Sequence, residues 1–135
     1  MANVQFENVI TYLYEAFPDV RPHFEQKSKE LYGEGLPHVV YGSVLVEYLN
    51  SLADQIGGEN HAISDKRLKE VFGLIEELSE SKDFETVCLV KTSVIEGVLG
   101  EKNGLKRFAA YMGPITRKLA HDLAQSWDLN TELLS

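Results

Sequence analysis

The residues in this sequence whose types and spacing could support a chemical function are carboxylates, and they gather in one part of the chain. Between Glu30 and Asp65 there are six acidic residues and no Lys or Arg in 36 positions. Residues 1–64 carry nine acids and three bases, whereas residues 65–135 carry twelve acids and ten bases. This concentration of negative charge is typical of a solvated face that keeps a protein soluble. It also suits a surface that attracts a basic partner.

Two of these carboxylates fall on the same side of one predicted helix. Glu47 and Asp54 are one heptad apart, with Asn50 and Ser51 between them. They lie opposite an apolar stripe, so they are expected to face solvent. A partner-binding surface is therefore predicted at Glu34, Glu47, Asn50, Ser51, Asp54 and Glu59.

Motifs for catalysis or for metal binding are absent from the sequence. It contains no GxSxG, no glycine-rich phosphate loop, no HExxH and no CxxC. No two of the four histidines are three to five residues apart, and the single cysteine, Cys88, has no nearby His, pair of Lys or helix N-terminus that would make it reactive. We therefore expect no enzymatic activity, no cofactor and no metal.

One lysine stands out because of its place in an apolar pattern. At 100° per residue, Lys91 falls near the centre of the apolar arc of a helix over residues 83–99. A lysine there must extend to the rim, pair with a carboxylate or line a groove. Glu76 on the preceding helix is the predicted partner.

Length and composition limit the class of protein. A chain of 135 residues with a formal charge of −8 fits one acidic domain, residues 1–135, that needs no disulfide or metal for stability. No apolar run reaches the length of a membrane span, and the N-terminus lacks the layout of a signal peptide. The negative charge argues against nucleic acid as a partner. We therefore expect a cytoplasmic protein with neither a membrane nor a nucleic acid as partner.

The periodicity of the apolar residues predicts an all-α fold. No strand pattern or βαβ spacing competes, and only residues 83–99, rich in valine, would also suit a strand. Six or seven helices joined by short loops fit antiparallel hairpins, arranged either as a helical bundle or as a short stack of the HEAT or armadillo kind. The predicted helices cover residues 3–17, 19–32, 38–56, 65–81, 83–99, 103–112 and 114–127.

Three segments together resemble a known family. The stretch KEVFGLIEELSESKDFETVCLVKTSVIEGVLG (69–100), with LPHVVYG (36–42) before it and YMGPITRKL (111–119) after it, resembles a family of small, all-helical, uncharacterised bacterial domains. Some members look like immunity proteins of contact-dependent or polymorphic toxin systems. The resemblance implies a class of protein and supplies no site residues.

The leading hypothesis is therefore an immunity protein that binds a cognate toxin domain and occludes its active site. Nucleases carry basic clefts for phosphate, and an acidic inhibitor complements such a cleft. The expected partner is thus a basic toxin domain, a nuclease. A helical adaptor or subunit of a bacterial assembly is the alternative, and an enzyme without a recognised motif is the third possibility.

Overall fold

The computed structural model describes residues 3–32, 36–101 and 103–134, and within these ranges every regular element is helical. The prediction of an all-α fold is therefore confirmed. The part of the chain that the structure describes contains no helix long and apolar enough to span a membrane.

The first half of the chain forms two short helices and one long interrupted helix. A 3₁₀ turn leads into α1 (Val9–Ala16), and Pro18 ends this stretch and opens a second 3₁₀ turn before α2 (Arg21–Tyr32). The third helix begins as α3 (Pro37–Val39), continues as a π-helical segment over Val40–Leu45 and ends as α4 (Val46–Asp54).

The second half of the chain also contains a long helix that a π-helical segment interrupts, and it ends with further helices and a 3₁₀ turn. Helix α5 (His61–Ser79) is followed by α6 (Phe84–Leu89), a second π-helical segment over Val90–Ile95, and α7 (Glu96–Gly100). The short α8 (Gly104–Phe108) runs into a 3₁₀ turn, and α9 (Pro114–Ser126) begins at a proline. A last 3₁₀ turn covers Glu132–Leu134.

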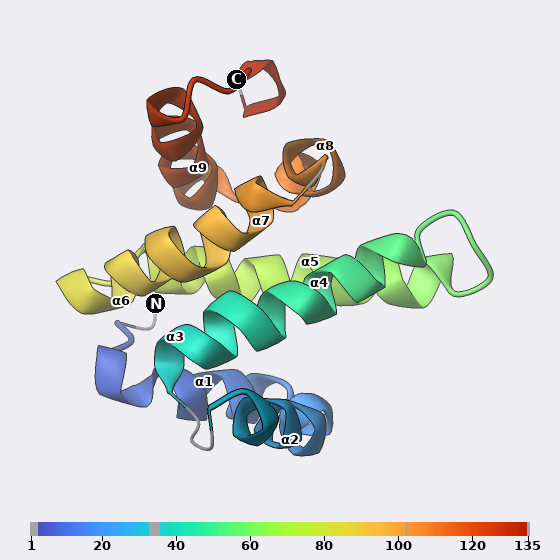
Figure 1. The fold of residues 1–135 in the computed structure, drawn as a ribbon, viewed down its shortest axis with the longest axis vertical. Coiled ribbons are helices and arrows are strands. Elements are labelled where there is room, and N and C mark those ends of the chain that lie inside the picture. The colour runs from blue at the N-terminus through green and yellow to red at the C-terminus, as the bar shows by residue number, and fades with distance from the viewer. Residues whose placement is uncertain (1–2, 33–35, 102, 135) are drawn as a thin grey trace.

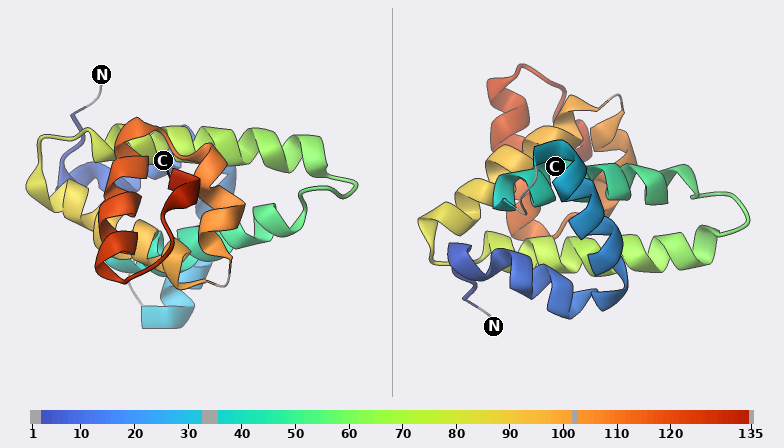
Figure 2. Two further views of the ribbon diagram at one scale, coloured as in Figure 1. Left: turned by 90° about the horizontal axis from the view of Figure 1, so that it is seen from above. Right: turned by 60° about the horizontal axis from the view of Figure 1, so that its bottom comes forward.

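Helices α4 and α5 form an antiparallel hairpin whose connecting loop projects beyond the rest of the fold (Figures 1 and 2). In Figure 1, α1 and α2 lie on one side of this hairpin, and α8 and α9 lie on the other. The stretch from α6 to α7 contacts α9 and the π-helical segment before α4. The core runs between these layers, and its largest fully buried side chains include Tyr41, Phe24, Phe72, Phe108 and Leu13.

The two π-helical segments contact each other near the middle of the fold. A Cβ on Gly42 would lie 3.2 Å from Cβ of Ser93, and a Cβ on Gly97 would lie 2.9 Å from Cγ2 of Val46. The two long helices therefore cross closely because glycine stands at the point of contact.

One predicted helix begins at the wrong residue. The segment 57–64 was expected to be loop, with the helix starting at residue 65, but α5 begins at His61. The side chain of Ser64 is buried, and its Oγ donates to Oε1 of Gln55 at 2.6 Å. This contact with the end of α4 stabilises a first turn that the apolar periodicity does not reveal.

Candidate functional site

The structure brings three of the predicted binding residues together in a groove of about 510 Å³ between α4 and the α7–α8 region. Glu47, Asn50 and Asp54 form the α4 wall, at positions i, i+3 and i+7 of one helix face. We call this groove the acidic groove; it is lined by Gly42, Ser43, Val46, Glu47, Asn50, Asp54, Gly97, Glu101 and Arg107.

The opposite wall of the acidic groove contains two charged residues that the sequence did not single out. Glu101 follows α7, and Arg107 lies on α8. The Arg107 guanidinium donates to Oδ1 of Asp54 at 2.6 Å and to the backbone oxygen of Asn50 at 2.9 Å. Its other terminal nitrogen donates to the side-chain oxygen of Asn50 at 3.2 Å. Arg107 therefore fixes the position of α8 against α4.

Two basic residues that lie outside the acidic part of the sequence are close to predicted carboxylates on α4. Arg107 pairs with Asp54, and Nζ of Lys27 on α2 lies 3.9 Å from Oε1 of Glu47. Both bases are distant in sequence, so a local charge count could not find them. The acidic groove still contains three carboxylates and one guanidinium, and the Glu47 side chain is 68% exposed.

Two other predicted binding residues, Ser51 and Glu59, do not line the acidic groove. Ser51 is exposed and lines a neighbouring cavity of about 90 Å³ together with His23, Lys27 and Glu47. Glu59 is exposed in the loop between α4 and α5, and Glu34 lies outside the described residues. The structure therefore brings together only the α4 members Glu47, Asn50 and Asp54 in one groove, and their role in partner binding stays a prediction.

The prediction for Lys91 is wrong, because its side chain is exposed. In α6 the buried residues are Thr86 and Leu89, and the π-helical segment then changes which face of the helix points inward. A π-helix bonds residues i and i+5, so it inserts one extra residue into the α-helical repeat. A projection at 100° per residue fails across such a segment.

The proposed partner of Lys91 has a different role. Oε1 of Glu76 accepts hydrogen bonds from the backbone nitrogen and the hydroxyl of Thr116, both at 2.8 Å. Oε2 accepts the backbone nitrogen of Ile115 at 3.0 Å. Glu76 therefore caps the N-terminus of α9, where a negative charge is favourable.

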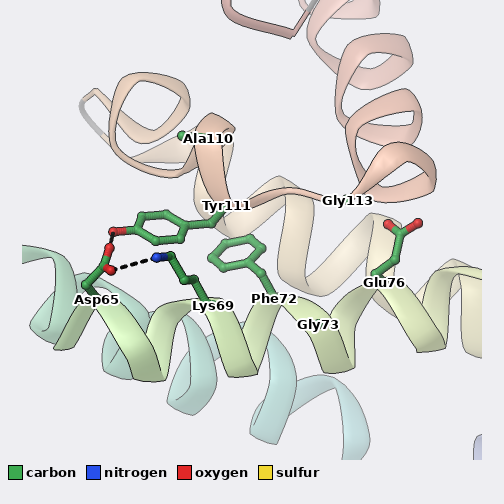
Figure 3. A pocket seen from close by; sticks show the side chains of 8 residues that line it. All are labelled: Asp65, Lys69, Phe72, Gly73, Glu76, Ala110, Tyr111 and Gly113. Carbon is green, nitrogen blue, oxygen red and sulfur yellow. Dashed lines mark hydrogen bonds and ion pairs between the residues drawn. The ribbon is translucent and has the colours of Figure 1, made fainter. Parts of the chain in front are cut away.

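A second groove, also of about 510 Å³, lies between α5 and the segment that joins α8 to α9 (Figure 3). We call it the aromatic groove; it is lined by Asp65, Lys69, Phe72, Gly73, Glu76, Ala110, Tyr111 and Gly113. The Tyr111 hydroxyl donates to Oδ1 of Asp65 at 2.6 Å, and Nζ of Lys69 lies 2.9 Å from Oδ2. Hydrogen bonds from Tyr111 and then from Lys69 lower the pKa of Asp65 below its usual 3.8.

The environment of Tyr111 predicts that its hydroxyl loses its proton at a higher pH than an ordinary tyrosine does. Burial, followed by the hydrogen bond to Asp65, raises the pKa of Tyr111 from 10 to about 12. Between these values the folded protein retains a proton that the unfolded chain has lost, so stability is complete below pH 10 and falls as the pH rises towards 12. In a spectrophotometric titration, the Tyr111→Phe variant should lack one tyrosinate transition near pH 12. Loss of a transition near pH 10 instead would contradict this assignment.

No group of three or more His, Cys, Asp or Glu side chains that could hold a metal ion occurs among the described residues. One histidine–serine contact joins segments that are distant in the sequence: Nδ1 of His38 lies 2.6 Å from Oγ of Ser93. Ser93 is 7% exposed, and neither residue lines a groove described above. We therefore assign the contact to helix packing.

The fold and the grooves define an acidic, all-helical protein with two surface grooves of the size that binds side chains or small ligands. Residues 10–128 match the model of the family described as Domain of unknown function (DUF7674), and the chain belongs to this family. Searches of curated proteins and of solved structures gave no match. The expected likeness to an uncharacterised domain family is confirmed, whereas the link to toxin immunity stays a prediction.

Proposed function

We propose that this protein is a cytoplasmic bacterial immunity protein, which binds a basic toxin domain through the acidic groove and occludes its active site. The observation that carries the proposal is the convergence of three carboxylates with a single guanidinium in that groove. The formal charge of −8 adds long-range attraction for a basic partner. The toxin is a nuclease in this proposal, because a nuclease cleft must be basic to hold phosphate.

Within the acidic groove, Glu47 and Glu101 are the carboxylates proposed to contact the partner. Asp54 is held by Arg107, and its interaction is already satisfied within the chain. Glu47 is largely exposed and has one weak contact with Lys27 at 3.9 Å. A basic side chain of the toxin would insert between Glu47 and Glu101, which stand on opposite walls.

Charge reversal at Glu47 and Glu101 tests this proposal. The Glu47→Lys, Glu101→Lys double variant should associate at least about tenfold more slowly at low salt with the toxin candidate encoded beside this gene, because electrostatic steering sets the association rate. Its rate should also depend less on salt. Glu7→Lys with Glu15→Lys is the matched control, since both residues are exposed near or in α1 and the charge change is the same.

A growth assay links binding to protection. Co-expression of the unmodified chain should restore growth to cells that produce the toxin candidate, and the groove variant should protect less than the control variant. A complex that forms without protecting growth would instead favour the adaptor hypothesis. Equal association rates and salt slopes for the two double variants would show that the acidic groove is not the binding surface.

A further inference from the structure

Gly73 occupies an unexpected position in the aromatic groove. It lies in the interior of α5, where glycine is the least favourable residue after proline. A Cβ at Gly73 would meet no atom within 4 Å, so no contact inside the chain requires a glycine there. The missing side chain leaves an open space above the backbone of α5, between Phe72 and Glu76 (Figure 3).

Aromatic side chains from α5 and from the segment after α8 pack together beside this space. The Phe72 ring stacks on Tyr111, with centroids 6.1 Å apart and an interplanar angle of 21°, and it also packs against Phe108 at 5.7 Å. The hydrogen bond from Tyr111 to Asp65 holds the Tyr111 ring along α5, above Lys69 and pointing away from Gly73 (Figure 3). Phe72 and Phe108 are buried, so an additional ring in the groove beside Gly73 would reach this cluster through the half-buried Tyr111. Such aromatic contacts favour binding beyond the area they bury.

The polar groups of the aromatic groove already have partners in the chain. Asp65 binds Tyr111 and Lys69, and Glu76 accepts three hydrogen bonds from the start of α9. Burying polar groups usually costs free energy because some of them lose their hydrogen-bond partners. An apolar side chain that enters the groove avoids this cost, since these groups keep their partners within the chain. The lining includes two carboxylates and one ammonium, so it carries a net negative charge. The residues of the partner on either side of the inserted side chain should therefore be basic.

We propose that the aromatic groove binds an aromatic side chain of a protein partner, flanked by basic residues, and that Gly73 keeps the space for it open. This docking site is separate from the acidic groove and does not depend on the partner being a toxin. Glycine at position 73 makes α5 less stable but leaves the groove open to a partner side chain. This combination distinguishes a binding role of Gly73 from a packing role.

Three blocked tripeptides serve as probes: Arg-Phe-Arg, Arg-Leu-Arg and Glu-Phe-Glu, each acetylated and amidated. Amide resonances of Gly73, Ala110 and Gly113 in the full ¹⁵N-labelled chain should shift saturably with Arg-Phe-Arg. Affinity should be lower for the leucine peptide and lowest for the glutamate peptide. Equal affinity for the leucine peptide would refute the aromatic occupant, and equal affinity for Glu-Phe-Glu would refute the basic flank. Absence of saturable shifts with all three would overturn the proposal.

Two kinds of substitution separate binding from folding. Gly73→Ala should raise the melting temperature by about 2–4 °C, because alanine favours helix and meets no clash. Gly73→Leu should weaken Arg-Phe-Arg binding at least tenfold by filling the space, and Gly73→Gln provides a second, more polar obstruction. A lower melting temperature for Gly73→Ala would show that α5 requires the glycine and would overturn the proposal.

The acidic-groove variant distinguishes this inference from the proposed function. Glu47→Lys with Glu101→Lys should leave the peptide-induced shifts at Gly73 unchanged. Loss of these shifts in that variant would show that the two grooves form a single site, contrary to the proposal.

Discussion

Gly104→Ala is expected to destabilise the protein by about 3 kcal/mol or more, because the new methyl group has no room. A Cβ at Gly104 would lie 1.8 Å from the carbonyl oxygen of Val98 and 2.9 Å from its carbon. Both are backbone atoms, so no side-chain rotation can relieve the clash. Urea denaturation followed by circular dichroism measures the loss.

The matched control is Gly100→Ala at the end of α7, where a Cβ would meet no atom within 4 Å. It should change the free energy of unfolding by no more than about 0.5 kcal/mol. Similar losses for the two variants would refute the close approach of residues 98 and 104. Because this approach sets the start of α8, Gly104→Ala should also displace Arg107 from Asp54 and disturb the acidic groove.

Ser93→Lys is expected to cost about 3 kcal/mol or more, because it places an ammonium in a packed crossing of two helices. Ser93 is 7% exposed, its Oγ contacts His38, and its Cβ lies next to Gly42. Thermal and urea unfolding provide the measurement.

The reciprocal substitution tests which face of the helix is buried. Lys91→Ser should alter stability by no more than about 0.5 kcal/mol, because Lys91 is exposed. An uninterrupted α-helix would give the opposite result, with position 91 inside and position 93 outside. Equal tolerance at both positions would contradict the π-helical segment over Val90–Ile95.

These substitutions bear on what can be predicted from the sequence. Apolar periodicity and proline positions predicted seven helical stretches, and the structure has helix in each of them. Such signals are local: a helix bonds residues four apart, and proline restricts its immediate neighbours. The outward face of α4 was predicted for the same reason, because Glu47, Asn50 and Asp54 follow the repeat of one helix.

The π-helical segments were beyond a sequence-based prediction. An inserted residue leaves the composition of a helix unchanged, and only packing against the crossing helix shows that the buried face has rotated. The predicted burial of Lys91 was wrong for this reason. The early start of α5 depends similarly on a contact between Ser64 and Gln55 that joins two helices.

The all-helical architecture, the absence of catalytic motifs and the acidic character of the N-terminal half follow from the amino-acid sequence alone. Which charges meet depends on how the helices pack. Arg107 is 53 positions from Asp54 in the chain, and Tyr111 is 46 positions from Asp65. Helix formation depends on neighbours within a few residues, whereas a groove depends on how whole helices cross. That crossing is set by close contacts at residues such as Gly42 and Gly97.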